Sequence, residues 1–184
     1  MTSTKPRVAV VYATAQGSTR EIAQFIADEL TQRGAEVEVA EVEHAPELTR
    51  FDAVVLGSAV HNRRFLPEAE SYIRAHRAEL SAVPVWLFSV GIGPALVGPI
   101  GRWFGGRVPP RIAALRDWIG ARAYQPFAGH YERAGVDLGA RTAFRLMGGP
   151  RYGDLRDWTA IRRWSTSVGD ALQLPAAHDT WVHP

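Results

Sequence analysis

The chain has 184 residues, a length that suits one domain with a sizeable buried core. It contains no cysteine, which excludes disulfides, cysteine-ligated metal sites and a thiol nucleophile. The 21 lysine and arginine residues are dispersed among 19 aspartate and glutamate residues, and the resulting charge of +2 argues against a dedicated nucleic-acid-binding protein. No stretch has the composition of a linker, so we expect one domain over residues 1–184, with flexible ends at 1–6 and 175–184.

The amino-terminal segment lacks the apolar core of a signal peptide, because its first apolar run starts at Val8. This favours a cytoplasmic protein. Residues 81–101 carry no charge and are long enough to raise the question of a membrane-spanning helix. Pro84, Pro94 and Pro99 interrupt the stretch, and proline inside a helix removes a hydrogen bond and clashes with the preceding turn. We therefore do not expect a transmembrane helix.

The first predicted strand is residues 7–13, a continuous β-branched and apolar run of the kind that parallel sheets bury on both faces. A polar loop follows. Residues 21–30 then place apolar side chains at helical spacing. We expect Ser18 or Thr19 to cap this helix and Gly34 to end it.

The middle of the chain continues the alternation of strands and helices. Residues 36–42 alternate charged and apolar side chains, which suits a strand near a sheet edge, whereas the apolar run 53–56 suits a central strand. An amphipathic helix is predicted over 67–80, with Pro67 in its first turn. Residues 84–90 read as a further buried strand.

The last third follows the same order, with a helix predicted over 111–119 and a short strand within 124–131. Residues 132–153 have no clear pattern. Residues 157–172 predict a closing helix whose inward side chains are Ile161, Trp164, Val168 and Leu172. Strands that alternate with helices indicate an α/β fold, a doubly wound parallel sheet with right-handed crossovers and helices on both faces.

The loop after the first strand is the most informative segment, because such sheets bind ligands outside the carboxyl ends of their strands. It consists of Thr14, Ala15, Gln16, Gly17, Ser18 and Thr19. Hydroxyls around a glycine at a helix N-terminus can bind a phosphate without any cation, because free N–H groups and the helix dipole attract anions. Walker and dinucleotide loops need different glycine patterns, which this loop lacks. Taken alone, the loop is equally compatible with a simple turn and N-cap that bind nothing.

The segment VVYATAQGSTREIAQFIADEL, residues 10–30, resembles the first strand, phosphate loop and first helix of flavodoxins. It differs at Gln16, where flavodoxins usually have a hydroxyl. Within that superfamily the chain is most similar to flavodoxin-domain proteins of the menaquinone-dependent protoporphyrinogen oxidase type. The shared segments are residues 19–23, 54–57, 88–90 and 157–158. The resemblance implies a five-stranded flavodoxin-like sheet, FMN as cofactor and oxidoreductase activity between an organic substrate and a quinone.

By the same resemblance, two later loops contact the flavin ring. The first follows the central strand and contributes Ser58, Ala59, Val60, His61 and Asn62. His61 lies where carriers often have tryptophan, and it is the one candidate for a catalytic role, with a plain surface histidine as the alternative. Asn62 lies where a backbone carbonyl faces flavin N5, in a turn that asparagine tolerates. The second loop contributes Ser89, Val90, Gly91, Ile92 and Gly93.

Neither ring loop supplies the aromatic side chains that cover the flavin of electron carriers. An uncovered ring is open to a bulky organic partner, and nearby arginines such as Arg63 and Arg64 favour a fully reduced anionic flavin. We therefore favour two-electron chemistry on a small molecule. The alternatives are a flavodoxin-type carrier that docks on redox proteins and a flavin-free receiver-type domain, which would need an acidic cluster that this loop lacks.

Two apolar segments with arginines, 92–107 and 141–151, have the character of surfaces that contact a quinone or lipid headgroups. Packing inside the protein is the first expectation for each segment, and peripheral contact with the inner face of a membrane is the alternative. No His-x-x-x-His or paired-carboxylate pattern supports a metal site or hydrolysis.

Overall fold

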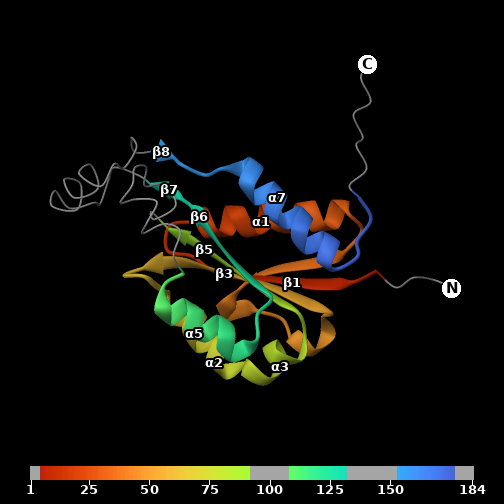
Figure 1. The fold of residues 1–184 in the computed structure, drawn as a ribbon, viewed down its shortest axis with the longest axis horizontal. Coiled ribbons are helices and arrows are strands. Elements are labelled where there is room, and N and C mark those ends of the chain that lie inside the picture. Colours follow the sequence, from red (N-terminus) through yellow and green to blue (C-terminus); the bar gives the residue numbers. More distant parts are fainter. Residues whose placement is uncertain (1–4, 92–107, 132–152, 177–184) are drawn as a thin grey trace, which may run out of the picture.

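The computed structural model describes residues 5–91, 108–131 and 153–176 of the chain. A six-stranded sheet forms the centre of the described part, and each pair of neighbouring long strands is parallel (Figure 1). In spatial order these strands are β2 (Glu36–Glu41), β1 (Arg7–Ala13), β3 (Ala53–His61), β5 (Val85–Gly91) and β6 (Ala123–Ala128), while β4 (Arg64–Phe65) pairs antiparallel with the end of β3.

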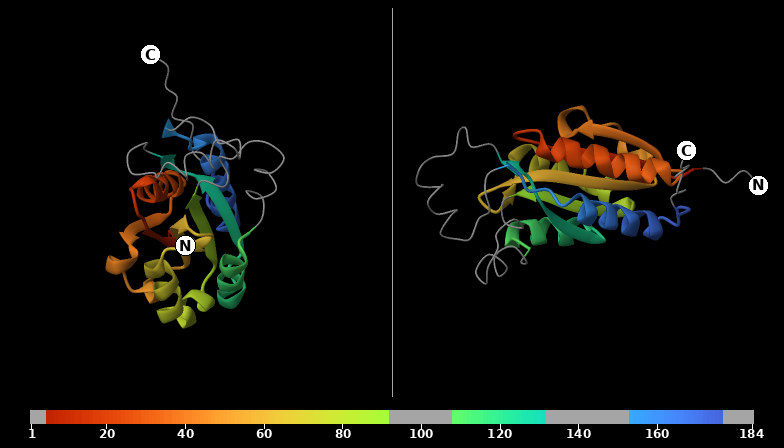
Figure 2. Two further views of the ribbon diagram at one scale, coloured as in Figure 1. Left: turned by 90° about the vertical axis from the view of Figure 1, so that its left-hand side faces the viewer. Right: turned by 90° about the horizontal axis from the view of Figure 1, so that it is seen from above.

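Helices cover both faces of the sheet, as Figures 1 and 2 show. One face carries α1 (Ser18–Gln32) and α7 (Trp158–Ala171), and the other carries α2 (Pro67–Ala75), α3 (Arg77–Ala82) and α5 (Pro110–Ile119). The remaining elements are short: two 3-10 turns, Val42–His44 and Leu48–Arg50, and a small ladder of β7 (His130–Tyr131) and β8 (Gly153–Asp154). The predicted doubly wound parallel sheet is confirmed.

Strand β1 is buried on both faces, as its composition predicts. Val8, Val10 and Tyr12 belong to the core under α1 and α7, while alternate residues belong to the core under α2, α3 and α5. Because side chains alternate across a strand, one apolar run serves both cores. Edge strand β2 is only half-buried, which explains its alternation of charged and apolar residues.

The core under α1 and α7 contains an aromatic cluster that brings β5, β6 and α7 together. The rings of Phe88, Phe127 and Trp164 lie 5.6 to 6.1 Å apart in tilted or edge-to-face contact. Gly57 in β3 allows this packing, because a Cβ at that position would lie 1.9 Å from the Phe88 ring. A glycine here is thus required by the neighbouring ring.

The long helix predicted over 67–80 is two helices, because the chain leaves helical geometry at His76 (φ −107°, ψ 27°). The His76 ring stacks on Tyr72 at 4.3 Å, and its Nδ1 lies 3.1 Å from the Tyr72 carbonyl oxygen. A side chain that competes for the carbonyl of the preceding turn is a local cause of such a break. Pro67 occupies the first turn of α2, as predicted.

The ends of the ordered core include residues expected to be flexible. The Pro6 carbonyl accepts a hydrogen bond from the Glu36 N–H at 2.8 Å. The Pro175 carbonyl accepts one from the buried guanidinium of Arg33, which also donates to Thr166, Asp170 and Leu174. Arg33 thereby fastens the chain after α7 to the end of α1.

No helix in the described ranges combines the length and the hydropathy that crossing a bilayer requires. The uncharged stretch 81–101 forms strand β5 in its described part, and proline 84 lies just before that strand. The two arginine-containing apolar segments, 92–107 and 141–151, lie outside the described residues.

Candidate functional site

The strand order places the candidate site at the carboxyl ends of β1 and β3. The chain passes from β1 outward to β2 and then returns to β3 on the other side of β1. The order in which strands are added to the sheet therefore reverses between β1 and β3. Crevices in open α/β sheets form where the order reverses, outside the carboxyl ends of the strands. The carboxyl ends of β1, β3 and β5 lie at this end of the sheet, on the left in Figure 1.

The loop after β1 opens helix α1 with a glycine and not with a hydroxyl residue. Gly17 is the N-cap, in left-handed geometry (φ 90°, ψ −24°), and its N–H donates to the Thr14 hydroxyl oxygen at 2.9 Å. The expectation that Ser18 or Thr19 caps the helix is therefore wrong. The cap moved because Thr14 closes the turn one residue earlier, which places Ser18 already inside the helix.

This opening leaves the first helical N–H groups free. The first bond of the helix runs from the Glu21 N–H to the Gly17 carbonyl at 3.1 Å, and no side chain caps the turn. The N–H groups of Ser18, Thr19 and Arg20 consequently have no acceptor among the described residues. Such a turn is the arrangement that attracts an anion, with the positive end of the dipole of α1 behind it.

The end of the last long strand packs against the same turn. The Ser18 hydroxyl accepts a hydrogen bond from the His130 N–H at 3.0 Å and lies 3.3 Å from the His130 carbonyl oxygen. Gly129 fits tightly beside it, because a Cβ there would lie 3.0 Å from Val90. The sequence did not single out these two residues; their place at the end of the last strand of a parallel sheet is the signal that could have found them.

A charged network flanks the first turn of α1. Arg156 donates to both oxygens of Asp154 at 2.7 Å, pairs with Glu21, and lies over the Trp158 ring at 4.6 Å. These bonds from Arg156 lower the pKa of Asp154 to about 2, although burial opposes the shift. Because two carboxylates share this guanidinium, the network adds no net positive charge beside the loop.

The loop expected to contribute Ser58 to Asn62 is the end of strand β3 and the turn of a hairpin. Strand β3 continues to His61, turns at Asn62 (φ 50°) and Arg63 (φ 61°), and returns as β4. The positive φ of Asn62 is one that asparagine tolerates, so the turn expected there is possible with this residue. The pairing of Val60 with Phe65, whose side chain is buried, explains why the strand extends beyond its apolar run.

The hairpin is anchored from its base. The Ser58 hydroxyl donates to the Ala59 carbonyl at 2.8 Å and accepts from the Leu66 N–H at 3.0 Å. Arg64 donates two hydrogen bonds to the Glu70 carboxylate, at 3.2 and 2.8 Å. These bonds lower the pKa of Glu70, although its burial opposes the shift.

The third predicted loop begins at Ser89. Its hydroxyl shares a hydrogen bond of 2.7 Å with the Tyr124 hydroxyl, so this side chain is engaged inside the fold. Val90 and Gly91 are buried at the end of β5. Ile92 and Gly93 lie outside the described residues. His61, Asn62, Ala15 and Gln16 are exposed at the same end of the sheet, while Ala59 and Val60 are half-buried.

Comparison with known proteins agrees with this geometry. Residues 9–96 match the profile of the family described as Flavodoxin domain. A flavodoxin from the domain Archaea superposes over 91% of this chain and 99% of its own, with a TM-score of 0.58 and 15% identity. The described part of the chain has a flavodoxin-like fold. Its strand order is that of this fold.

Two relatives of this chain share one name. The protoporphyrinogen IX dehydrogenase (quinone) of Escherichia coli is 28% identical over 85 residues, which are 45% of this chain and 47% of that protein. The protein of that name from Leishmania major is 28% identical over 95 residues, 50% of this chain and 41% of its own. The matches thus span about half the length of these relatives.

Proposed function

We propose that this flavodoxin-like chain binds FMN and transfers electrons between an organic substrate and a quinone. The observation that carries the proposal is the uncapped first turn of α1, where the N–H groups of Ser18, Thr19 and Arg20 have no described acceptor. A doubly negative phosphate would accept hydrogen bonds from these groups. Its position at the reversal of strand order is where this fold binds flavin phosphates.

The residues of the loop fit a phosphate group in three ways. Gly17 gives the backbone a left-handed turn that brings the N–H groups of the next residues to one point. The Thr14 hydroxyl stabilises that turn, and the link from Ser18 to His130 holds the turn against the last strand. Gln16 and Ala15 are exposed beside it.

The bound flavin would supply the redox chemistry, and the chain would orient and enclose it. Asn62 at the tip of the β3–β4 hairpin, with His61 beside it, and the end of β5 at Val90 and Gly91 are the described residues that would hold the ring. None of these described residues is a tryptophan, tyrosine or phenylalanine, so the ring would stay open to a bulky partner.

Two arguments support an organic substrate and a quinone. An uncovered ring suits direct contact with an organic molecule more than the long-range transfer of a carrier. Both curated relatives are named for protoporphyrinogen IX and quinone, which makes that pair the first to test. We further propose that the protein is cytoplasmic and contacts membranes peripherally through 92–107 and 141–151, which flotation with anionic and neutral liposomes would test.

One experiment separates the possibilities. The purified protein is examined for its visible spectrum, the flavin is released and identified, and protoporphyrinogen oxidation is followed anaerobically with a menaquinone analogue. The proposal expects FMN and quinone-dependent turnover. A yellow protein that ignores both compounds but reduces a redox protein would identify an electron carrier, and a protein without affinity for FMN would overturn the proposal.

A further inference from the structure

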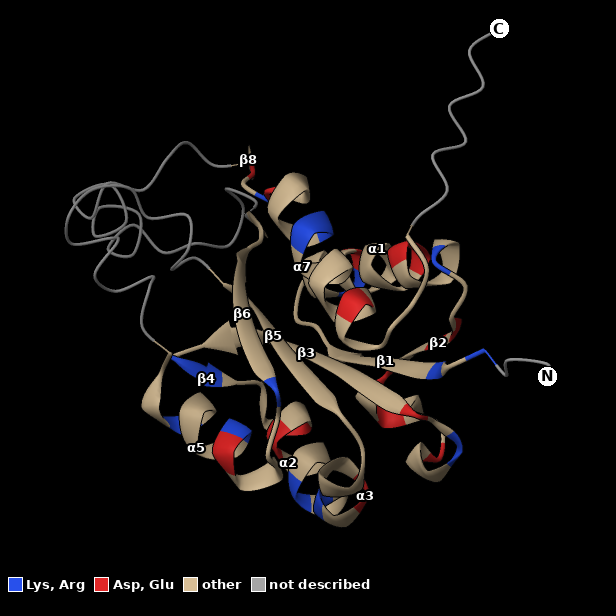
Figure 3. Ribbon diagram, turned by 45° about the vertical axis from the view of Figure 1, so that its right-hand side comes forward, with Lys and Arg blue, Asp and Glu red and all other residues tan. Residues whose placement is uncertain are grey.

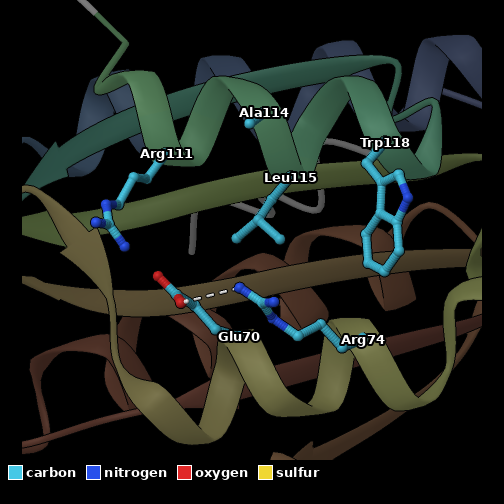
Figure 4. Close-up of a pocket in the computed structure, with 6 residues that line it drawn as sticks. All are labelled: Glu70, Arg74, Arg111, Ala114, Leu115 and Trp118. Carbon is cyan, nitrogen blue, oxygen red and sulfur yellow. Dashed lines mark ion pairs between the residues drawn. The ribbon is translucent and has the colours of Figure 1, made fainter.

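A groove between α2 and α5 lies on the face of the sheet opposite α1 and α7, and it is separate from the phosphate loop. Its volume is about 340 Å³, within the range of roughly 300–1,000 Å³ that small-molecule sites occupy. Six side chains line it, and Figure 4 shows how they face one another: Glu70, Arg74, Arg111, Ala114, Leu115 and Trp118.

At the charged end of the groove, arginine side chains outnumber the one carboxylate. Three guanidinium groups, those of Arg64, Arg74 and Arg111, surround the single carboxylate of Glu70. Arg64 binds both carboxylate oxygens and Arg74 lies 3.7 Å from one of them, so that carboxylate is already satisfied. Arg111 makes no hydrogen bond or ion pair with any described residue. In Figure 3, basic and acidic positions lie close together along α2, α3 and α5 on this side of the sheet.

Helix geometry adds to the positive field at this end. Arg111 lies in the first turn of α5, and Glu70 lies near the start of α2. Both helices therefore direct the positive ends of their dipoles toward the charged end of the groove. A second anion placed beside Arg111 would meet N–H donors in a planar fork that matches a carboxylate, and none of these donors has an acceptor among the described residues.

The other end of the groove is apolar and aromatic. Trp118 is 42% exposed and is the large hydrophobic side chain that stands out at the surface of the described residues. Arg77 lies over its ring at 4.8 Å, which fixes the indole beside the groove. Leu115 and Ala114 lie between Trp118 and Arg111 on the same face of α5. Trp118 follows Arg111 by seven positions, which corresponds to about 10 Å along a helix axis.

We propose that this groove binds a planar aromatic carboxylate of about two fused rings, with its carboxylate on Arg111 and its rings between Leu115 and Trp118. The length matches because a naphthalene ring with one carboxylate spans about the two helical turns that separate the two ends. A small neutral aromatic would leave Arg111 unused, and a simple anion would leave Trp118 exposed. The site does not depend on the flavin proposal, since it shares no lining residue with the phosphate loop.

The test titrates 2-naphthoate into protein labelled with nitrogen-15, with excess FMN present, and follows the indole N–H signal of Trp118 by NMR. The variant W118F assigns that signal. We expect a saturable shift with a Kd of about 1 mM or tighter, as the ligand's size suggests. The variant R111Q should weaken binding about tenfold, because one charge-assisted contact is lost. The matched control R116Q removes a cation from the same helix that is already paired with Asp117, and should leave binding unchanged.

Four results would overturn the proposal. The first is that the Trp118 signal does not shift at millimolar 2-naphthoate. The second is that R111Q binds 2-naphthoate as tightly as the unaltered protein does, and the third is that 2-naphthalenemethanol, the neutral analogue of equal size, binds as tightly as 2-naphthoate. The fourth is a signal that shifts with protein concentration together with a dimer that R111Q dissociates, which would make the groove an interface between two copies. Loss of binding in R111Q with retention in R116Q supports the assigned site.

Discussion

The Ser18 hydroxyl accepts a hydrogen bond from the His130 N–H at 3.0 Å, which joins the first turn of α1 to the end of the last long strand. These residues are 112 positions apart in the chain. The turn proposed to hold the phosphate is therefore positioned by a tertiary contact as well as by its own sequence. Removing the contact should loosen the site without removing any of its backbone donors.

The variant S18A tests this relationship. We expect FMN affinity to fall about three- to tenfold and the free energy of unfolding to fall by about 1 kcal/mol, the usual net contribution of one hydrogen bond. Calorimetric titration with FMN and urea unfolding measure the two effects. The control S167A removes a hydroxyl that bonds only within α7, to the Trp164 carbonyl. Equal FMN affinities in S18A and S167A would show that the contact does not support the site.

Gly17 should be sensitive to substitution because of its backbone geometry. A side chain at φ 90° is strained although no neighbour occupies its space, so G17A should cost about 1 kcal/mol of stability or distort the turn. A distorted turn would weaken FMN binding tenfold or more. The matched control is G120A, since Gly120 also has a left-handed φ, of 66°, at the end of α5. G120A should lose similar stability and keep its FMN affinity; a parallel loss of affinity in both would contradict the assignment.

Gly57 and Phe88 should behave as a coupled pair. In G57A the new Cβ would lie 1.9 Å from the ring of Phe88, which is fully buried and cannot withdraw. Overpacking of this kind typically costs about 1–3 kcal/mol or more. Adding F88L to G57A should recover part of that loss, and urea unfolding of the four variants of the cycle gives the coupling. Strict additivity of the two substitutions would contradict the close packing.

The pH dependence of stability should carry a contribution from Asp154. Its folded pKa, about 2, lies below its ordinary value of 3.8, so the contribution is present above pH 3.8 and is lost as the pH falls through 2. The variant D154N lacks the contribution throughout. The stability difference between the unaltered protein and D154N should therefore shrink over this window in urea unfolding. The control is D117N, because Asp117 pairs with a different arginine, Arg116. A stability difference between the unaltered protein and D154N that stays constant with pH would contradict the pKa shift.

The pattern of apolar and polar residues predicted the strands and helices whose burial follows from neighbouring residues in the chain. The apolar run of β1, the edge character of β2, and the inward Ile161, Trp164 and Val168 of α7 follow from periodicity alone and are confirmed. Hydrogen bonds from side chains to nearby backbone groups were harder to predict from the sequence. The Thr14 hydroxyl moved the N-cap to Gly17, and the break at His76 divided one predicted helix into two.

Contacts between residues distant in the chain were not predicted from the sequence. The hydrogen bond between Ser18 and His130 and the pairing of Arg156 with Glu21 each depend on how separate elements pack together. Even so, the segment predicted to bind phosphate lies at the reversal of strand order. The residues expected to contact the ring at Ile92 and Gly93 lie outside the described residues, and the ring contacts stay predictions.

The most direct measurement compares FMN and riboflavin binding to protein stripped of any flavin. The account predicts one FMN per chain and an affinity for riboflavin, which lacks the phosphate, at least about a hundredfold weaker, because two to three charge-assisted hydrogen bonds are lost. Equal affinities for the two compounds, or no binding of FMN, would contradict the claim that the free N–H groups at the start of α1 hold a phosphate.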